Sequence, residues 1–238
     1  MNRFVLIAVA AGLVVSSGIL RRAIAGSTAA DQVTRVSCIG DSITFGSGTK
    51  TPKTDSYAAQ LGRMLGDTYT VTNFGVSGAT LLNHGDHPYQ KSSSMRRALN
   101  SKPDIVIIML GTNDTKPQNW KFKDEFVADY QDMIGQFRNL DSHPKIFICL
   151  PPFVGKDGNY GINEAGVEDQ IPLIRKLATD ENVTLIDNYT PLKDHPDLLP
   201  DNVHPNKDGA AYLAKSVFAA ITGKVSEGEV PPATQKSR

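Results

Sequence analysis

Short apolar or alternating runs along this chain are followed by stretches in which apolar residues recur every three or four positions. The runs are typical of strands, and most stop at a glycine or a proline. They predict strands at 36–39, 69–74, 105–110, 145–150 and 183–186. The helical spacing predicts helices within 55–65, 95–99, 122–137, 164–180 and 206–221. Strands that alternate with helices predict an α/β fold, a parallel sheet covered by helices on both faces.

Some segments fit this alternation less well. Pro172 lies within 164–180, where a proline is expected to start the helix or to kink it. Residues 190–200 show no clear periodicity and are expected to be irregular, and residues 80–94 are expected to form a polar loop.

Composition narrows the class of protein. The chain has 238 residues, of which 40% are hydrophobic, which suits one domain with a full core. Lys and Arg together equal Asp and Glu at 25 each, and no basic run points to a nucleic-acid partner. The two cysteines, Cys38 and Cys149, lie in apolar runs without the spacing of a Cys/His site, so no metal or cofactor is expected.

The two ends of the chain differ from its middle. Arg3 precedes an apolar run over residues 4–20, and small residues follow, which predicts a signal peptide over residues 1–25 and an exported protein. Because the run is almost long enough to span a bilayer, an uncleaved membrane anchor is the alternative. Residues 26–223 then form the domain, and residues 224–238, which lack apolar periodicity, form a disordered tail.

Side chains suited to ester hydrolysis follow the predicted strands. Ser42 comes after Gly40 and Asp41 at the end of the first strand, and ligands bind at this edge of open α/β sheets. Acyl transfer needs a nucleophile, a base and donors for the oxyanion. Ser42 is the candidate nucleophile and His204 the candidate base, with Asp201 three residues earlier to orient it. The alternative is that Asp41 and Ser42 only cap the next helix.

Two further strand ends supply candidate donors for an oxyanion hole. Gly75 follows the second strand and Asn113 follows the third. The backbone N–H groups of Ser42 and Gly75 and the side-chain amide of Asn113 could together hold a negatively charged oxygen. A glycine at position 75 has no Cβ to block the substrate.

Four segments together resemble a known family. They are Gly40–Ser42, Asn73–Gly75, Gly111–Asp114 and Asp201–Pro205. They look like the four blocks of the SGNH hydrolases, also called GDSL esterases/lipases, and they occur in the family's order. The resemblance implies a flavodoxin-like three-layer α/β/α sandwich with a five-stranded parallel sheet in the order 2-1-3-4-5. It also implies Ser42 as nucleophile, an Asp201/His204 pair, and Gly75 and Asn113 in the oxyanion hole. In that order the third strand separates Cys38 from Cys149, so the two should stay unpaired.

The expected substrate is a small-molecule or glycan ester. The loops expected to border the site are polar, which favours a short acyl group, acetyl above all, on a sugar. Residues 111–120 resemble SGNH proteins described as sialate O-acetylesterases and related acetyl-carbohydrate esterases. The candidate substrate-binding residues are Asp41, Asp114, Trp120 and His84. For Trp120 the alternative is core packing, and for His84 it is a polar surface loop.

Two other functions stay open at this point. A lysophospholipase or thioesterase could use the same scaffold, because fold does not fix substrate. A non-catalytic flavodoxin-like module could hold a phosphate at the turn over residues 40–42. Membrane association is expected only if the N-terminal segment is kept as an anchor.

Overall fold

The computed structural model describes residues 33–156 and 158–224. The predicted signal peptide or anchor over 1–25 therefore lies outside the described residues, as does the predicted tail apart from Lys224. Within the described ranges, no helix combines the length and the apolar character needed to cross a membrane.

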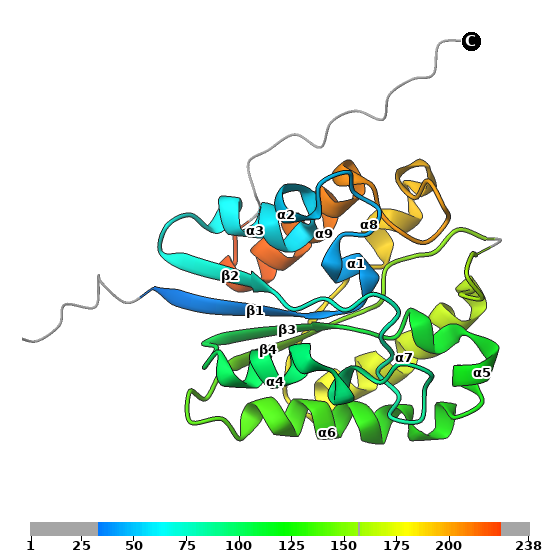
Figure 1. Ribbon diagram of the computed structural model, residues 1–238, viewed down its shortest axis with the longest axis horizontal. Helices are drawn as coiled ribbons and strands as arrows, with labels where there is room; N and C mark the ends of the chain where they lie inside the picture. The colour runs from blue at the N-terminus through cyan, green and yellow to red at the C-terminus, as the bar shows by residue number, and fades with distance from the viewer. Residues whose placement is uncertain (1–32, 157, 225–238) are drawn as a thin grey trace, which may run out of the picture. The chain divides into compact units, whose positions relative to one another are not determined.

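A parallel sheet forms the middle layer, with the strand order β2-β1-β3-β4-β5 (Figure 1). Its strands are β1 (Thr34–Gly40), β2 (Tyr69–Asn73), β3 (Ile105–Met109), β4 (Lys145–Cys149) and β5 (Thr184–Ile186). In the register, Val36 of β1 lies opposite Val71 of β2 and Ile105 of β3. The predicted fold class and strand order are confirmed.

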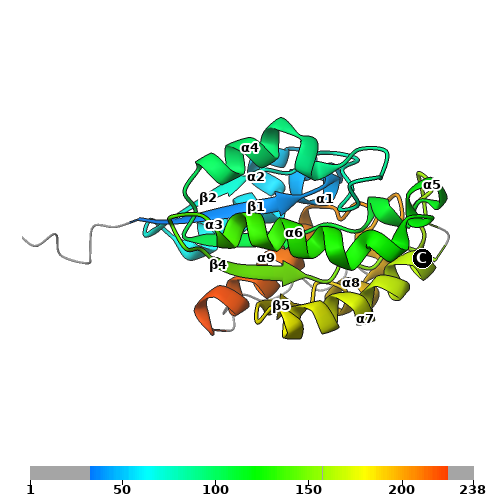
Figure 2. The same ribbon diagram turned by 90° about the horizontal axis from the view of Figure 1, so that it is seen from below.

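Helices cover both faces of the sheet. One layer holds α1 (Ser42–Phe45), α2 (Pro52–Asp55), α3 (Tyr57–Leu65), α8 (Thr190–Lys193) and α9 (Lys207–Thr222) (Figure 1). The other holds α4 (Ser93–Asn100), α5 (Pro117–Trp120), α6 (Phe126–Arg138) and α7 (Glu164–Asp180), and Figure 2 shows α4, α6 and α7 over this face. Short 3₁₀ turns lie at Tyr89–Lys91, Asn113–Thr115, Lys123–Glu125 and Pro196–Leu198.

The core has two parts, one on each face of the sheet. Ile107 of β3 packs with the side that carries α3 and α9, and its neighbour Ile108 packs with the side that carries α6. Successive strand residues point to opposite faces, so a strand covered on both sides must be apolar at every position. This explains the continuous apolar run over residues 105–110.

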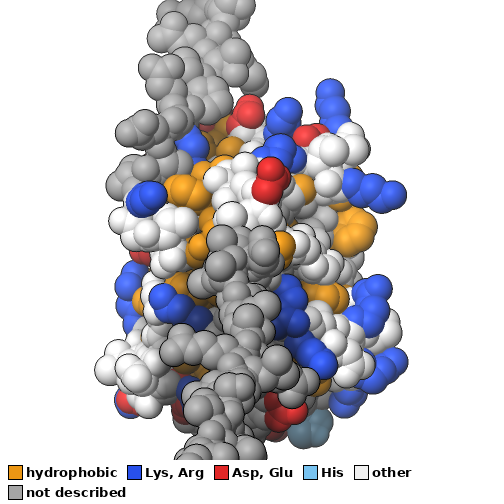
Figure 3. Space-filling model, turned by 90° about the vertical axis from the view of Figure 1, so that its left-hand side faces the viewer, with side chains coloured by type: hydrophobic (Ala, Val, Ile, Leu, Met, Phe, Trp, Pro, Cys, Tyr) orange, Lys and Arg blue, Asp and Glu red, His pale blue; other side chains and the backbone are white. Residues whose placement is uncertain are grey.

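Side chains that carry chemistry gather at one end of the sheet. Figure 3 shows the opposite end, where β1 begins, and there Lys and Arg side chains lie scattered among uncharged side chains and a few acidic ones. The carboxyl ends of the strands lie at the right of Figure 1, where the loops after β1, β2, β3 and β4 meet.

The structure changes two expectations about helices. Of the two roles expected for Pro172, the start of α7 is excluded, because Pro172 lies inside the helix Glu164–Asp180. Asn163 starts this helix instead, because its side chain accepts a hydrogen bond from the N–H of Gly166 at 2.8 Å. Residues 190–200 are also more regular than expected, since they contain α8 and a 3₁₀ turn.

The two cysteines are buried and free. Strand β3 lies between β1, which carries Cys38, and β4, which carries Cys149. Burial raises the pKa of the Cys38 thiol to about 12, and the pKa of Cys149 is also raised by burial. Both side chains therefore behave as small apolar core residues.

Candidate active site

Ser42 is placed by a tight turn between β1 and α1. A Cβ at Gly40 would collide with Thr44 Oγ1 and with the carbonyl oxygen of Met109, so only glycine lets the chain turn here. Asp41 caps α1, because its Oδ1 accepts a hydrogen bond from the N–H of Ile43 at 2.9 Å. Ser42 is thus the first residue of a helix at the carboxyl edge of the sheet.

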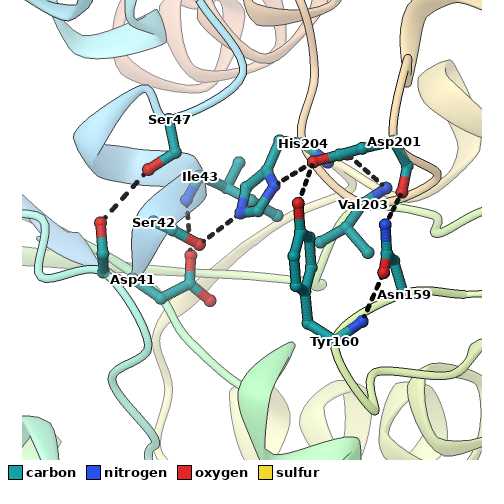
Figure 4. A network of polar contacts seen from close by, with 10 residues as sticks. Asp41, Ser42, Ile43, Ser47, Asn159, Tyr160, Asp201, Val203 and His204 are labelled. Carbon is teal, nitrogen blue, oxygen red and sulfur yellow. Dashed lines mark hydrogen bonds and ion pairs between the residues drawn. The ribbon is translucent and has the colours of Figure 1, made fainter.

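A chain of hydrogen bonds joins Ser42, His204 and Asp201 (Figure 4). The distance from Ser42 Oγ to His204 Nε2 is 2.8 Å, and that from His204 Nδ1 to Asp201 Oδ2 is 2.7 Å. Burial disfavours the charged form of Asp201. The hydrogen bonds from the His204 side chain, from its N–H and from the N–H of Val203 outweigh this, and they lower the pKa of Asp201.

The charge on Asp201 decides which nitrogen of His204 can act as a base. An ionised carboxylate only accepts hydrogen bonds, so Nδ1 of His204 carries the proton that Asp201 Oδ2 binds. Nε2 is then left without a proton and can accept one from Ser42 Oγ. Asp201 is itself held in place, because its Oδ1 accepts the N–H groups of Val203 at 3.0 Å and His204 at 2.7 Å.

A glycine-rich segment before α7 packs on this pair. The Tyr160 hydroxyl donates to Asp201 Oδ2 at 3.3 Å, and the ring of Tyr160 lies 5.7 Å from that of His204 (Figure 4). The Asn159 side chain donates to the carbonyl oxygen of Asp201 at 3.1 Å. Sequence reasoning did not predict the contact of Tyr160 with Asp201, because it joins residues 41 positions apart in the chain.

A small cavity of about 270 Å³ opens beside Ser42 Oγ. The residues that line it are Ser42, Ser47, Ser77, Gly78, Asn113, Lys116, Tyr160, Ile162 and His204. Asn113 is buried, and its side-chain amide donates one hydrogen bond to the carbonyl oxygen of Ala79 at 3.1 Å. An amide group carries two N–H donors, so one remains for a ligand.

The structure does not bring Gly75 to this cavity. Its N–H donates to Asn73 Oδ1 at 2.9 Å, and a Cβ at this position would collide with the backbone nitrogen of Phe45. Glycine is therefore required here for close packing against α1, not for the approach of a substrate. Gly78, three residues further along the loop and with φ of +80°, lines the cavity instead. Both glycines follow β2, and the sequence alone does not show which one faces Ser42.

Asp41 and Asp114 are buried beneath the site and do not line the cavity. Asp41 is 1% exposed, and Asp114 is 0% exposed. The carboxylate of Asp114 accepts the N–H groups of Leu81 at 3.0 Å and Leu82 at 2.8 Å. Burial raises the pKa of Asp41 to about 6 and that of Asp114 to about 7. Through these hydrogen bonds Asp41 fixes the turn after β1, and Asp114 fixes the loop after β2.

Trp120 and His84 also lie away from the cavity lining. The Trp120 indole donates to Asp169 Oδ2 at 3.3 Å, and its ring packs edge-on against Phe126. His84 is exposed and lies 2.6 Å from Glu125 Oε2 through its Nδ1. Core packing and a surface loop describe these two residues better than substrate contact does. In the described part of the chain, no group of three or more His, Cys, Asp and Glu side chains is placed to hold a metal ion.

Comparison with known proteins defines the class. The model of the GDSL-like lipase/acylhydrolase family matches residues 38–212, so the chain belongs to this family. The family is described as one of lipases and acylhydrolases. Its fold, with the strand order β2-β1-β3-β4-β5, is that of the SGNH hydrolases.

Several similar proteins carry the name of an acetylesterase. An acetylxylan esterase from Xylanibacter ruminicola is 38% identical over 206 residues, which cover 79% of this chain and 43% of that protein. The chain thus spans less than half the length of this curated relative. The crystal structure of an acetyl xylan esterase, AlAXEase, is 25% identical with a TM-score of 0.63, and the match covers 79% of this chain and 99% of that one. A carbohydrate acetylesterase from Sinorhizobium meliloti, 21% identical with a TM-score of 0.63, shares the fold over 80% of this chain and 99% of its own.

Proposed function

We propose that this protein is a serine esterase that removes short acyl groups, acetyl above all, from a carbohydrate. The observation that carries the proposal is the row of hydrogen bonds that joins Asp201, His204 and Ser42 Oγ. Ser42 and His204 line the 270 Å³ cavity. A nucleophile, a base and a group that orients the base are the parts that acyl transfer needs.

Ser42 attacks the ester in the first half of the proposed reaction. As Ser42 Oγ bonds to the carbonyl carbon, His204 Nε2 takes its proton, and Asp201 stabilises the charged imidazole. The tetrahedral intermediate then collapses, and His204 gives the proton to the oxygen of the departing sugar. A water molecule attacks the acyl group left on Ser42 in the second half, again with His204 as base. The carboxylic acid leaves, and Ser42 regains its proton.

The negative oxygen of the intermediate needs donors that are already in place. The N–H of Ser42 belongs to the first turn of α1, where backbone N–H groups have no partner within the helix. The remaining N–H of the Asn113 side chain is a second donor, and the backbone N–H of Gly78 is the third. Gly78 takes the role first expected of Gly75, because Gly78 lines the cavity beside Ser42.

The size and lining of the cavity support a short acyl group. Ser47, Ser77 and Lys116 supply polar surface, and Ile162 is the aliphatic side chain among the lining residues. A lysophospholipase or a long-chain thioesterase would need an extended apolar groove instead. The relatives named acetylxylan esterase support an acetylated polysaccharide as the substrate, in preference to a sialate ester.

We also propose that the protein is exported, with residues 1–25 as a signal peptide or anchor. The pattern in the sequence supports this proposal, and so does a polysaccharide substrate, because such polymers lie outside the cytoplasm. A non-catalytic binding module is disfavoured by the hydrogen-bonded Ser42 and His204, which a phosphate site would not require.

A panel of p-nitrophenyl esters tests the acyl group, and release of acetate from acetylated xylan tests the carrier. We expect kcat/KM to fall steeply beyond butyrate, because added methylenes meet the wall of the cavity rather than an open apolar groove. The Ser42→Ala protein serves as the control for background hydrolysis. A preference for octanoate or longer esters would contradict the proposal and favour the lysophospholipase alternative.

A further inference from the structure

Whereas the first cavity is lined by Ser42 at the start of α1, a second cavity, of about 400 Å³, is lined by Phe45 at the end of that helix. Its walls come from α1, α2, α3, the end of β2 and α4, and they include Phe45, Pro52, Lys53, Val71, Gly75 and Arg97. The proposed ester hydrolysis makes no use of this cavity. Its lining combines apolar surface with two cations and contains no carboxylate.

The two cavities are lined by different residues of the same two segments, α1 with the turn that follows it and the loop after β2. Phe45 follows Ser42 by one turn of α1, a rise of about 4.5 Å along the helix. Gly75 lines the second cavity, and Ser77 on the same loop lines the first. The side chains of Ser47 and Ser77 lie 3.2 Å apart and bridge α1 to this loop. A ligand that occupies both cavities must therefore be longer than one sugar residue.

The cations of the second cavity are not neutralised by the protein. Across the described residues, neither Lys53 nor Arg97 forms an ion pair with a carboxylate. Arg97 donates to the neutral Ser94 hydroxyl at 2.8 Å, which steadies the guanidinium without cancelling its charge. Both side chains are exposed at the cavity. An anionic group in the cavity would gain two unpaired partners.

Each of the two cavities has an exposed aromatic residue in its lining. Phe45 is 46% exposed and Tyr160 is 60% exposed, and Val33 is the third large apolar residue that is exposed within the described ranges. Phe45 lines the second cavity and Tyr160 lines the first. Aromatic faces beside a few polar groups are typical of sites that bind small organic ligands. The rings offer flat surfaces for two sugar residues of one chain.

We propose that the second cavity is a subsite for a sugar residue that carries a carboxylate, next to the acetylated residue on the same polysaccharide. The ring of this acidic sugar packs on Phe45, and its carboxylate lies between Lys53 and Arg97. The inference rests on the proposed function, because the acetyl ester must lie at Ser42 when the acidic sugar occupies the second cavity.

Acetylated oligosaccharides test the subsite. One substrate is an acetylated xylo-oligosaccharide that carries a uronic acid, and the other is the same molecule with its carboxylate reduced to an alcohol. We expect a higher kcat/KM for the acidic form, by up to about fivefold for each cation, and a smaller preference at high salt. Arg97→Gln and Lys53→Gln should reduce this preference and leave kcat/KM for the neutral form and for p-nitrophenyl acetate unchanged.

Matched controls separate the possible failures. Arg96→Gln removes an exposed cation of α4 that does not line the cavity, and it should leave the preference intact. Equal kcat/KM for the two oligosaccharides in the unaltered protein would overturn the subsite. Failure to hydrolyse either oligosaccharide would instead contradict the proposed function. In that case calorimetry with the Ser42→Ala protein still tests the subsite: tighter binding of the acidic form supports it, and equal binding refutes it.

Discussion

Two buried carboxyl groups should make this protein more stable in mildly acidic than in neutral solution. Burial is the main cause that raises the pKa of Asp41 to about 6 and that of Asp114 to about 7, and the charge of Asp41 contributes to the shift of Asp114. In the unfolded chain both groups titrate near 3.8. The folded protein therefore holds more protons than the unfolded chain between about pH 4 and pH 7, and stability falls as the pH rises through this window.

The size of the effect follows from the two shifts. One pKa unit corresponds to about 1.4 kcal/mol. Going from pH 5 to pH 7.5 should therefore lower the free energy of unfolding by about 4 kcal/mol through Asp41 and Asp114 together. For a domain of this size each kcal/mol moves Tm by about 3 °C, so Tm should fall by roughly 10 °C. Asp201 acts in the opposite sense, because its pKa is lowered, and its contribution is lost only below about pH 4.

Thermal unfolding followed by calorimetry between pH 4.5 and pH 8 would measure this slope. The Asp114→Asn protein should lose more than half of it, because Asp114 has the larger shift and an amide does not ionise. The control is Asp67→Asn, since Asp67 is exposed in the folded protein and should leave the slope unchanged. A Tm that stays flat or rises from pH 5 to pH 7.5 would refute the reasoning, as would an unchanged slope in Asp114→Asn.

Three further predictions concern the site. Ser42→Ala should abolish ester hydrolysis at an unchanged Tm, and the double variant with His204→Ala should be no worse than either single one, because the residues act as a unit; additive losses in kcat would argue against this. Asn113→Ala should lower kcat by about 10²–10³-fold at a similar KM, with circular dichroism to verify the fold; an unchanged kcat would remove Asn113 from the oxyanion hole. Tyr160→Phe should lower kcat only a few-fold and alter its pH profile, because it removes one hydrogen bond to Asp201 and keeps the ring beside His204. A pH profile identical to that of the unaltered protein would limit Tyr160 to packing.

Strands, helices and short turns follow from residues close together in the sequence, so they could be predicted. The contacts that orient Gly75 come from segments distant in the sequence, so they could not. The apolar run at 105–110 has only one stable use, a strand buried on both faces, and β3 lies there. Asp201 and His204 are close in the chain and meet through a turn. The direction of Gly75 depends instead on a bond to the Asn73 side chain and on the approach of α1. No local pattern shows such contacts in advance.

Burial of polar residues was equally hard to predict. Asp114 looks like a ligand-binding residue because it follows a strand next to Asn113. In the structure its carboxylate accepts hydrogen bonds from two backbone N–H groups of a loop more than 30 positions earlier in the chain. Trp120 likewise packs against Phe126 and donates to Asp169, and neither partner lines the cavity.

The segment between β4 and α7 limits where residues can be inserted into the chain. It is rich in glycine and partly exposed, and such loops usually accept insertions. Here the N–H of Gly155 donates to the carbonyl oxygen of Asn202 at 2.6 Å, and Asn159 and Tyr160 bind Asp201. The spacing between these anchor points is therefore fixed by their bonds to Asp201 and Asn202, shortly before His204 in the chain. Lengthening this loop should impair turnover even where the fold tolerates it, so engineered fusions or added sequence belong elsewhere on the surface.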